Sequence, residues 1–279
     1  MYIFPELGEV PIHKITAYKT IKVLKPIEAK GSYETIKRLC QRLNEIMVYA
    51  ENCGLIDINP LTGIRQAFQA PTKQHLPTIK PEELGSFLKT LSFASIKITT
   101  RCVIEWQLHT MVRPSEAAGT RWDEIDFENS LWEIPAERMK SKKLHKVPLS
   151  SQAVSLLELM KDISSKSDFV FPSNSSLRKH TNSSTANMAL KRMGFKEKLV
   201  AHGMRSLAST ILNEEGFDGD VIEACLAHTG KNEVRNAYNR ATYLDRRKPV
   251  MQWWSEHIEK AATGDISLTG RQGLKIVNL

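Results

Sequence analysis

The strongest constraint on the fold is the spacing of apolar residues, which follows a helical period over most of the chain. Residues 32–54 place them at three- and four-residue steps, with Ser32 as a candidate cap and Gly54 as a stop. Similar patterns run over residues 81–91, 95–111 and 152–163, and they resume at Ser184, Gly203, Asp220 and Leu244. Short extended runs occur at 130–135, 144–149 and 168–171, the first two as a hairpin. The sequence predicts a mainly α protein with a small antiparallel β-sheet.

A polar stretch with two prolines, residues 69–78, interrupts the helical patterns. The 279 residues also favour two domains at about 100 to 200 residues each. We therefore predict a helical domain at 1–70, a linker at 71–78 and a larger domain at 79–262. Residues 263–279 are polar and aperiodic, which predicts a flexible tail.

Composition excludes several classes of protein. Hydrophobic residues make up 41% of the chain and charged residues 25%, proportions that argue against a disordered protein. The sequence contains no internal repeat, which argues against a solenoid. Neither a signal peptide nor a membrane helix is recognised, so we expect a soluble, cytoplasmic protein. The cysteines lie far apart without a CxxC pair and are expected to be reduced and buried: Cys40, Cys53, Cys102 and Cys225.

Positive charge is concentrated in two places. The net charge is 39 − 31 = +8, which favours a polyanionic partner. One cluster occupies nine residues without an acid: Arg138, Lys140, Lys142, Lys143 and Lys146. A second cluster consists of Arg178, Lys179 and His180. By themselves these clusters leave two interpretations open, nucleic-acid contacts and simply solvated surfaces.

Motifs for nucleotide or metal chemistry are missing from the sequence. Neither GxGxxG nor GxxxxGK[ST] nor HExxH occurs. One acidic cluster could be a nuclease metal site or a solvated turn, and we favour the turn: Asp123, Glu124, Asp126 and Glu128.

Four short motifs stand out at the ends of predicted elements. They are RPSE with Arg113 and Glu116, HGMR with His202 and Arg205, LAHTG with His228, and AYNRATY with Tyr238. Each has an ordinary explanation by itself, as a helix cap, a core histidine or a core tyrosine. Their order along the chain is much more specific than any one of them.

Together these motifs resemble the tyrosine recombinase family, also called phage integrases, over residues 81–259. The stretches RPSEAAGTRWDEID, HGMRSLASTILNE and AYNRATYLDRR are similar to integrases of satellite phages and genomic islands. Such integrases generally carry a further amino-terminal arm-binding domain, whereas this sequence begins almost directly at the expected core-binding helices. The resemblance implies a DNA-clamping core-binding domain at 1–70 and a catalytic domain at 79–262.

The resemblance also implies a role for each motif residue. Arg113 and Arg205 match the family's catalytic arginines, and Lys140 matches its hairpin lysine. The remaining catalytic positions are His202, His228 and the nucleophile Tyr238, with Tyr243 as the competing tyrosine and Glu116 as a supporting acid. Further DNA contacts are expected from Arg138, Lys142, Lys143, Lys146, Arg178 and Lys179.

This residue set is chemically coherent for attack on a phosphodiester. Two guanidiniums favour a phenolate and the growing charge on phosphorus, and a lysine can protonate the departing 5′ oxygen. A phosphotyrosine conserves the bond energy, so neither ATP, a metal nor another cofactor is expected.

The implied activity is site-specific cleavage and rejoining of double-stranded DNA, for integration or excision of a phage or genomic island. The expected assembly is a monomer that forms a homotetramer on DNA, with DNA-bending accessory proteins as further partners and no membrane. Two alternatives stay open, a nicking–closing enzyme like type IB topoisomerases and an impaired integrase remnant that only binds DNA.

Overall fold

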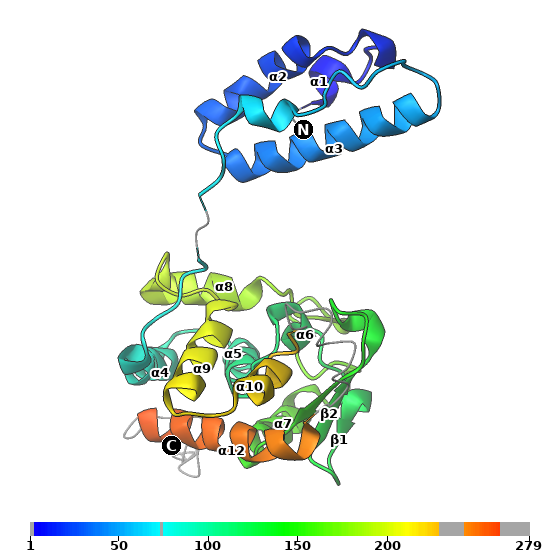
Figure 1. The fold of residues 1–279 in the computed structure, drawn as a ribbon. Coiled ribbons are helices and arrows are strands. Elements are labelled where there is room, and N and C mark those ends of the chain that lie inside the picture. The colour runs from blue at the N-terminus through cyan, green and yellow to red at the C-terminus, as the bar shows by residue number, and fades with distance from the viewer. Residues whose placement is uncertain (1–2, 73–74, 229–242, 263–279) are drawn as a thin grey trace. The chain divides into compact units, whose positions relative to one another are not determined.

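A computed structural model describes residues 3–72, 75–228 and 243–262. The chain separates into two compact units, residues 1–75 and 76–279, and each is described by itself (Figure 1). The boundary falls within the stretch that the sequence predicts to be a linker. Tyr238 and the predicted tail at 263–279 lie outside the described residues.

The first unit is a small helical domain. Its elements are α1 (Phe4–Leu7), η1 (Ile12–Lys14), α2 (Ala17–Ala29), α3 (Tyr33–Asn52) and η2 (Ile64–Ala67). Helix α3 packs on α2 and η2 because its buried residues recur every three or four positions: Ile36, Cys40, Leu43, Met47 and Ala50.

The ends of α3 differ in how well the sequence predicts them. Ser32 stands at the amino-terminal cap position, but its side chain makes no capping hydrogen bond there. Gly54 follows the helix at φ 69°, a left-handed conformation that glycine adopts without a steric penalty. The Leu55 N–H donates to the Ala50 carbonyl at 2.9 Å and the Gly54 N–H to the Glu51 carbonyl at 3.0 Å. The predicted stop is confirmed as a Schellman motif.

The second unit is mainly helical, with two small antiparallel sheets. Its helices are η3 (Pro81–Glu83), α4 (Leu84–Phe93), α5 (Ile98–Thr110), α6 (Pro114–Ala118), η4 (Trp122–Glu124), η5 (Ala136–Arg138), α7 (Ser151–Ser164), α8 (Thr185–Leu190), η6 (Lys191–Phe195), α9 (Gly203–Glu214), α10 (Gly219–Cys225) and α12 (Leu244–Ala261). Its strands are β1 (Ile125–Asp126), β2 (Leu131–Ile134), β3 (His145–Pro148), β4 (Pro172–Ser173) and β5 (Ser176–His180).

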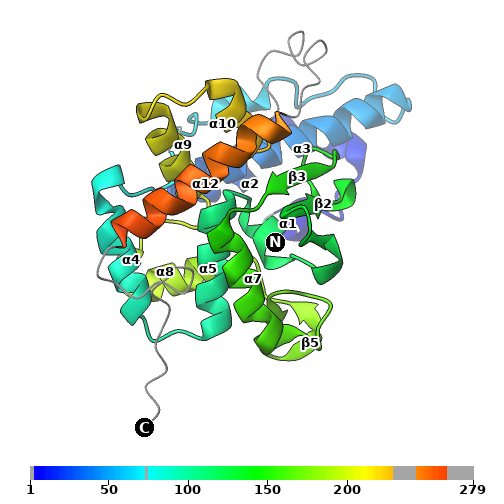
Figure 2. The ribbon, with the colours of Figure 1, turned by 90° about the horizontal axis from the view of Figure 1, so that it is seen from below.

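Helix α5 lies at the centre of this unit, where every residue from Cys102 to Thr110 is buried. The Trp254 indole N–H on α12 donates to the Leu108 carbonyl at 2.7 Å. The Trp106 ring meets Trp132 of β2 with centroids 5.1 Å apart. Figure 2 shows α12 running across α5 and α7. Residues within or beside the RPSE, HGMR and LAHTG motifs belong to this one core, among them Val112, Ala117, Met204 and Leu226.

The predicted hairpin is confirmed, and it has a third strand. Strand β2 pairs antiparallel with β3, placing Trp132 opposite Val147, and β1 adds to the other edge of β2. The prediction at 168–171 is only partly right: Phe169 makes a single bridge to Arg121, and the second sheet is formed instead by β4 and β5.

Two smaller expectations are also settled in the described residues. Cys40, Cys102 and Cys225 are free and buried as predicted, but Cys53 is exposed because it follows the last turn of α3. None of the described helices is both long enough and apolar enough to cross a membrane.

Candidate active site

Arg113 is oriented by Glu116 at the start of α6. Pro114 occupies the first turn of this helix, where a missing N–H costs nothing. The Glu116 carboxylate accepts a hydrogen bond from the Arg113 main-chain N–H at 2.8 Å and from its guanidinium Nη1 at 2.9 Å. Because Glu116 is only 2% exposed, this charged pair is well shielded from water. Glu116 thus fixes both the helix end and the guanidinium.

Arg205 lies in the first turn of α9 and is 3% exposed. Its Nη1 donates to the Met111 carbonyl, and its Nη2 donates to the Leu226 carbonyl at 2.5 Å. Main-chain carbonyls from two separate turns therefore hold this guanidinium, so its direction is set by the backbone.

Two left-handed residues stand at these turns. Met111 ends α5 at φ 55°, and Ala227 follows α10 at φ 49°. Residues with a Cβ seldom adopt this conformation, and such strain gathers at functional sites. The Met111 carbonyl accepts from Arg205, and the Ala227 carbonyl accepts from Arg113 Nη2 at 3.3 Å. The strained turns therefore bring Arg113 and Arg205, the arginine pair, to one place.

His228 joins the arginine pair from the end of α10. Its Nε2 lies 3.0 Å from Arg205 Nη2, and its Nδ1 lies 2.9 Å from the Glu223 carboxylate. A guanidinium can only donate, so Nε2 is the acceptor and Nδ1 carries the proton. These two contacts hold the His228 ring between Arg205 and Glu223.

His202 stands at the amino-terminal end of α9 and is half-buried. Burial lowers the pKa of His202, and the positive charges of Arg205 and Arg113 lower it further. The imidazole is therefore neutral at pH 7 and can accept a proton.

The glycine of the HGMR motif has a packing role. A Cβ at Gly203 would lie 2.2 Å from the Pro77 carbonyl oxygen. The Thr78 hydroxyl donates to the Gly203 carbonyl at 2.9 Å, and the Val200 N–H donates to the Pro77 carbonyl at 3.2 Å. Only glycine lets the end of the predicted linker, at Pro77 and Thr78, lie this close to α9.

Burial and the charge of Arg113 both act against the charged form of Arg205. Burial lowers the pKa of Arg205 to about 10, and repulsion by Arg113 contributes to that shift. Glu116 and the more distant Glu223 act in the opposite direction without offsetting it. The site therefore favours a bound anion, and planar guanidiniums suit the oxygens of a phosphate.

Lys140 lies in the loop that joins η5 to β3, here called the basic loop (residues 139–144). Met139 anchors this loop in the core at 1% exposure, whereas Lys140, Lys142 and Lys143 are exposed. Within the described ranges, none of these three lysines forms an ion pair. The predicted general acid is thus in an accessible loop, and no hydrogen bond ties it to the arginine pair.

His145 and Lys146, on strand β3, differ from the basic loop. His145 is buried at 8% exposure, and burial together with three nearby arginines lowers its pKa to about 3. The imidazole is therefore neutral at pH 7, so it cannot act as an imidazolium acid. Lys146 contributes less free charge than the sequence suggests, because its ammonium lies 2.5 Å from the Glu133 carboxylate on β2.

Arg138 makes its contacts within the protein, and its predicted role as a DNA contact stays a prediction. Its guanidinium forms an ion pair with Glu124 and donates to the Glu116 carbonyl at 2.7 Å. Its side chain is 21% exposed, and the close backbone of Gly119 leaves room for it. The cation is thus already paired inside the protein.

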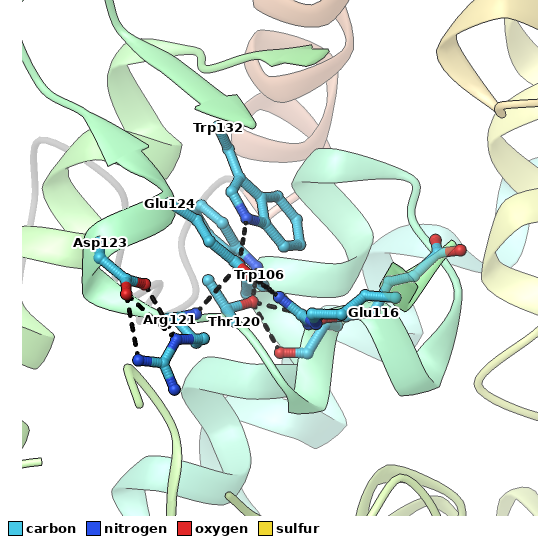
Figure 3. Close-up of polar contacts among 9 residues, drawn as sticks. Trp106, Glu116, Thr120, Arg121, Asp123, Glu124 and Trp132 are labelled. Carbon is cyan, nitrogen blue, oxygen red and sulfur yellow. Dashed lines mark hydrogen bonds and ion pairs between the residues drawn. The ribbon is translucent and has the colours of Figure 1, made fainter. Parts of the chain in front are cut away.

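Glu124 is correspondingly buried, whereas Asp123 and Glu128 are exposed, so the solvated turn that the sequence favours does not include Glu124. Figure 3 shows the Trp132 indole N–H directed to the Glu124 carboxylate, at 3.0 Å, and Arg121 paired with Asp123. Asp126 instead accepts hydrogen bonds from Asn129. In the described part of the chain, no group of three or more acidic, histidine or cysteine side chains is arranged to hold a metal.

Arg178 and Lys179 lie on β5, which the sequence analysis did not recognise as a strand. Both side chains are exposed, as is neighbouring His180. This hairpin provides a second accessible basic surface.

The nucleophile assignment rests on sequence, because Tyr238 lies outside the described residues. The competing Tyr243 is described. It caps α12 at φ 51°, is half-buried, and has the Arg246 guanidinium 5.4 Å from its ring centre. Tyr238 therefore stays a prediction.

Arg247 is a buried charged residue that the sequence analysis did not single out. It lies in α12 at 2% exposure, on the face formed by Val250, Met251, Trp254 and Ile258. A charged residue at three- and four-residue spacing within an apolar face was the available signal.

The sequence matches two domain families. The phage integrase family matches residues 77–244, and the phage integrase central domain matches residues 1–67. Prophage integrase IntA of Escherichia coli K12 is 50% identical over 275 residues, covering 99% of this chain and 67% of that protein. The integrase of Enterobacteria phage P4 is 35% identical, covering 99% of this chain and 66% of that protein. The chain thus spans about two thirds of the length of these relatives.

Solved structures agree on the fold. A λ integrase (75–356) dimer bound to a COC′ core site matches with a TM-score of 0.63 and 17% identity, covering 85% of this chain and 84% of that one. A λ integrase tetramer bound to a Holliday junction matches with a TM-score of 0.64 and 18% identity, covering 82% and 68%. With the ordered motifs around the arginine pair and the family match over most of the second unit, this chain belongs to the phage integrase family of tyrosine recombinases.

Proposed function

We propose that this protein is a site-specific recombinase that integrates or excises a phage or genomic island through a 3′-phosphotyrosine on Tyr238. The observation that carries the proposal is the arginine pair, in which Arg205 is buried, Arg113 is half-buried, and main-chain carbonyls hold both guanidiniums. Such a site is preorganised for the phosphorane that forms during phosphoryl transfer.

The chemistry assigns one task to each group. Neutral His202 accepts the phenol proton of Tyr238 as the phenolic oxygen attacks phosphorus. The bond from phosphorus to the 5′ oxygen breaks, and Lys140 protonates that oxygen. Arg113 and Arg205 bind the nonbridging oxygens, while His228 keeps Arg205 in place. Attack by a 5′ hydroxyl on the phosphotyrosine reverses these steps and rejoins the strand.

The proposed partner is double-stranded DNA with an attachment-type core site. Residues 1–70 form the core-binding domain, residues 71–78 the linker and residues 79–262 the catalytic domain. The DNA-bound λ integrase structures support this partner, and the Holliday-junction complex supports a homotetramer on DNA formed from free monomers. Bending proteins complete the recombination complex on cytoplasmic DNA.

A trapping experiment tests the proposal and locates its DNA site. The protein is incubated with a library of nicked, attachment-like duplexes, covalent adducts are isolated, and both the DNA and the modified peptide are sequenced. The nucleotide is expected on Tyr238, with Tyr238→Phe binding DNA but forming no adduct and Tyr243→Phe forming it normally.

Other outcomes identify the alternatives. Adducts on Tyr243 overturn the nucleophile assignment, and DNA binding without any adduct indicates an integrase remnant. Relaxation of supercoiled plasmid without strand exchange between two recovered sites indicates a nicking–closing enzyme.

A further inference from the structure

The guanidinium of Arg138 joins the start of the basic loop to two other elements. Arg138 is the last residue of η5 and stands two positions before Lys140. Its Nη1 pairs with the Glu124 carboxylate of η4, and its Nη2 donates to the Glu116 main-chain carbonyl of α6 at 2.7 Å. The chemistry proposed for this chain assigns no task to these two contacts.

Glu124 is a fixed partner for Arg138. Its side chain is 6% exposed, and both of its oxygens accept from Arg138 Nη1. One oxygen also accepts from the Trp132 indole N–H of β2 at 3.0 Å and from the Arg121 main-chain N–H at 3.2 Å (Figure 3). Hydrogen bonds between two ionised groups are stronger than neutral ones. Donors from three parts of the chain therefore hold the carboxylate, and the carboxylate holds Arg138.

Glu116 connects Arg138 to the arginine pair. Its carboxylate accepts from Arg113 Nη1 at 2.9 Å, while its main-chain carbonyl accepts from Arg138 Nη2. The turn after α6 also fits closely around this guanidinium, since a Cβ at Gly119 would lie 2.8 Å from Arg138 Nη2. Arg138 therefore has a fixed place relative to Arg113.

The basic loop changes from buried to exposed within two residues of Arg138. Met139 belongs to the core, and its N–H donates to the Ala136 carbonyl at 3.2 Å, whereas Lys140 is exposed. A general acid works only within hydrogen-bond reach of the atom that it protonates, about 2.6 to 3.2 Å between heavy atoms. A misplacement of about 1 Å can slow a reaction about 100-fold. A fixed start of the loop thus limits where the Lys140 ammonium can go.

Resting on the proposed function, we propose that Arg138 is a positioning residue for the general acid. By binding Glu124 and Glu116, it fixes the start of the basic loop relative to Arg113, so that the Lys140 ammonium reaches the departing 5′ oxygen. Arg138 acts through Lys140 and does not itself touch the reacting atoms.

The test asks whether the loss of Arg138 is a loss of proton donation. Each protein is mixed with the core duplex recovered by trapping, made once with the normal 5′ bridging oxygen and once with sulfur in its place. A thiolate leaves without a proton, so the sulfur substrate does not need the general acid. Adduct formation is followed in a single turnover with protein in saturating excess, so that a change in DNA affinity does not alter the measured rate.

The variants separate the Arg138 contacts from their surroundings. Arg138→Met removes both contacts. A second protein combines Arg138→Met with Glu124→Gln, which also removes the buried carboxylate charge that would otherwise lack its partner. The matched control is Arg121→Met, because the Arg121 guanidinium pairs with Asp123 of η4 rather than with the basic loop. Arg138→Met is also made in the Lys140→Ala background.

Action through Lys140 predicts different losses on the two substrates. Arg138→Met is expected to form the adduct about 30-fold more slowly on the oxygen substrate, a smaller loss than that of Lys140→Ala, and less than about threefold more slowly on the sulfur substrate. The protein with both substitutions is expected to behave in the same way, and Arg121→Met to stay within about threefold on both. In the Lys140→Ala background, Arg138→Met is expected to add less than about threefold, because the group that it positions is already gone.

A purely structural Arg138 gives a different pattern. Equal slowing on the two substrates, wild-type rates on both, or a larger further loss in the Lys140→Ala background overturns the inference, while the adduct formed by the wild type leaves the proposed function standing. If Arg138→Met does not fold, the protein that also carries Glu124→Gln decides. Failure of both to fold overturns the inference, because Arg138 is then needed for folding itself. Failure of the wild type to form any adduct overturns the proposed function and this inference together.

Discussion

The arginine pair and the basic loop are two cationic regions of the second unit, and they are constructed in opposite ways. Arg113 and Arg205 are held by Glu116 and by carbonyls of strained turns. Lys140, Lys142 and Lys143 lie exposed, without ion-pair partners in the described part of the chain. One region is rigidly organised before DNA arrives, and the other is free to adapt to it.

The difference follows from the work proposed for each region. Stabilising charge on phosphorus requires donors that are already in place, because reorganisation during the reaction reduces the benefit. Donating a proton to a leaving oxygen requires reach and access to the DNA. Arg138 and His145 flank the basic loop in sequence, yet they are structurally like the arginine pair, since tertiary contacts pair Arg138 with Glu124 and bury His145.

The largest effect is expected at the arginine pair. Arg205→Ala should slow adduct formation by at least about 10³-fold, since it removes a transition-state donor, its charge and the tie between the Met111 and Leu226 carbonyls. Arg205→Lys should lose about 10²-fold, because one ammonium cannot reproduce the planar fork. Single-turnover cleavage of the trapped core duplex measures both. Wild-type cleavage by Arg205→Lys would show that the fork geometry is unimportant.

The second effect distinguishes the basic loop from the arginine pair. Lys140→Ala should cleave normal DNA about 10² to 10⁴-fold more slowly, but recover most of its rate when sulfur replaces the 5′ bridging oxygen. A thiolate leaves without a proton, because a thiol has a pKa near 8.5. Arg205→Ala should not recover in this way. Rescue of Lys142→Ala or Lys143→Ala in place of Lys140→Ala would move the general acid to that neighbour.

The third effect concerns buried histidines and pH. His109 and His145 have pKa values lowered to about 3 by burial, against about 6.5 when unfolded. Their stabilising contribution is therefore complete above pH 6.5 and is lost as pH falls from about 6.5 to about 3. Each of the two histidines should therefore lower the free energy of unfolding by about 2 kcal/mol when the pH falls from 7 to 5.

Urea denaturation at the two pH values measures that loss. The double variant His109→Gln, His145→Gln provides the comparison, and it should show a shallower fall in unfolding free energy with acid. An equally steep fall in the double variant would assign the acid sensitivity to other groups.

The smallest effect separates exposed basic residues from paired ones. Replacing Arg178 and Lys179 with alanine should reduce the slope of log K against log salt by about 1 for each phosphate that the variant no longer binds. Arg138→Met should leave that slope unchanged but lower the unfolding free energy by about 3 kcal/mol, because it strands the buried Glu124. Binding titrations at several salt concentrations measure the slope. A reduced slope for Arg138→Met would show that Arg138 contacts DNA.

Much of the fold was predictable from local patterns. The apolar period of residues 32–54 and the stop at Gly54 match α3 closely, because periodicity and a left-handed glycine act within one helix. Strand β5 was missed, since its exposed SLRKH sequence has no buried face to reveal alternation. Asp123 and Glu124 are neighbours in sequence, yet one is exposed and the other buried. Only a distant partner, Arg138, distinguishes them.

The sequence by itself determined the family and the order of its candidate catalytic residues, because each motif is a short run of particular residue types that can be read directly from the chain. It also determined most helices, since helical hydrogen bonds are local. Tertiary structure decided which positively charged side chains are exposed and which are buried or paired within the protein. Arg138, His145 and Arg247 acquire their states from elements far away in the chain. Burial and charge pairing depend on distance in space, and local sequence contains no measure of that distance.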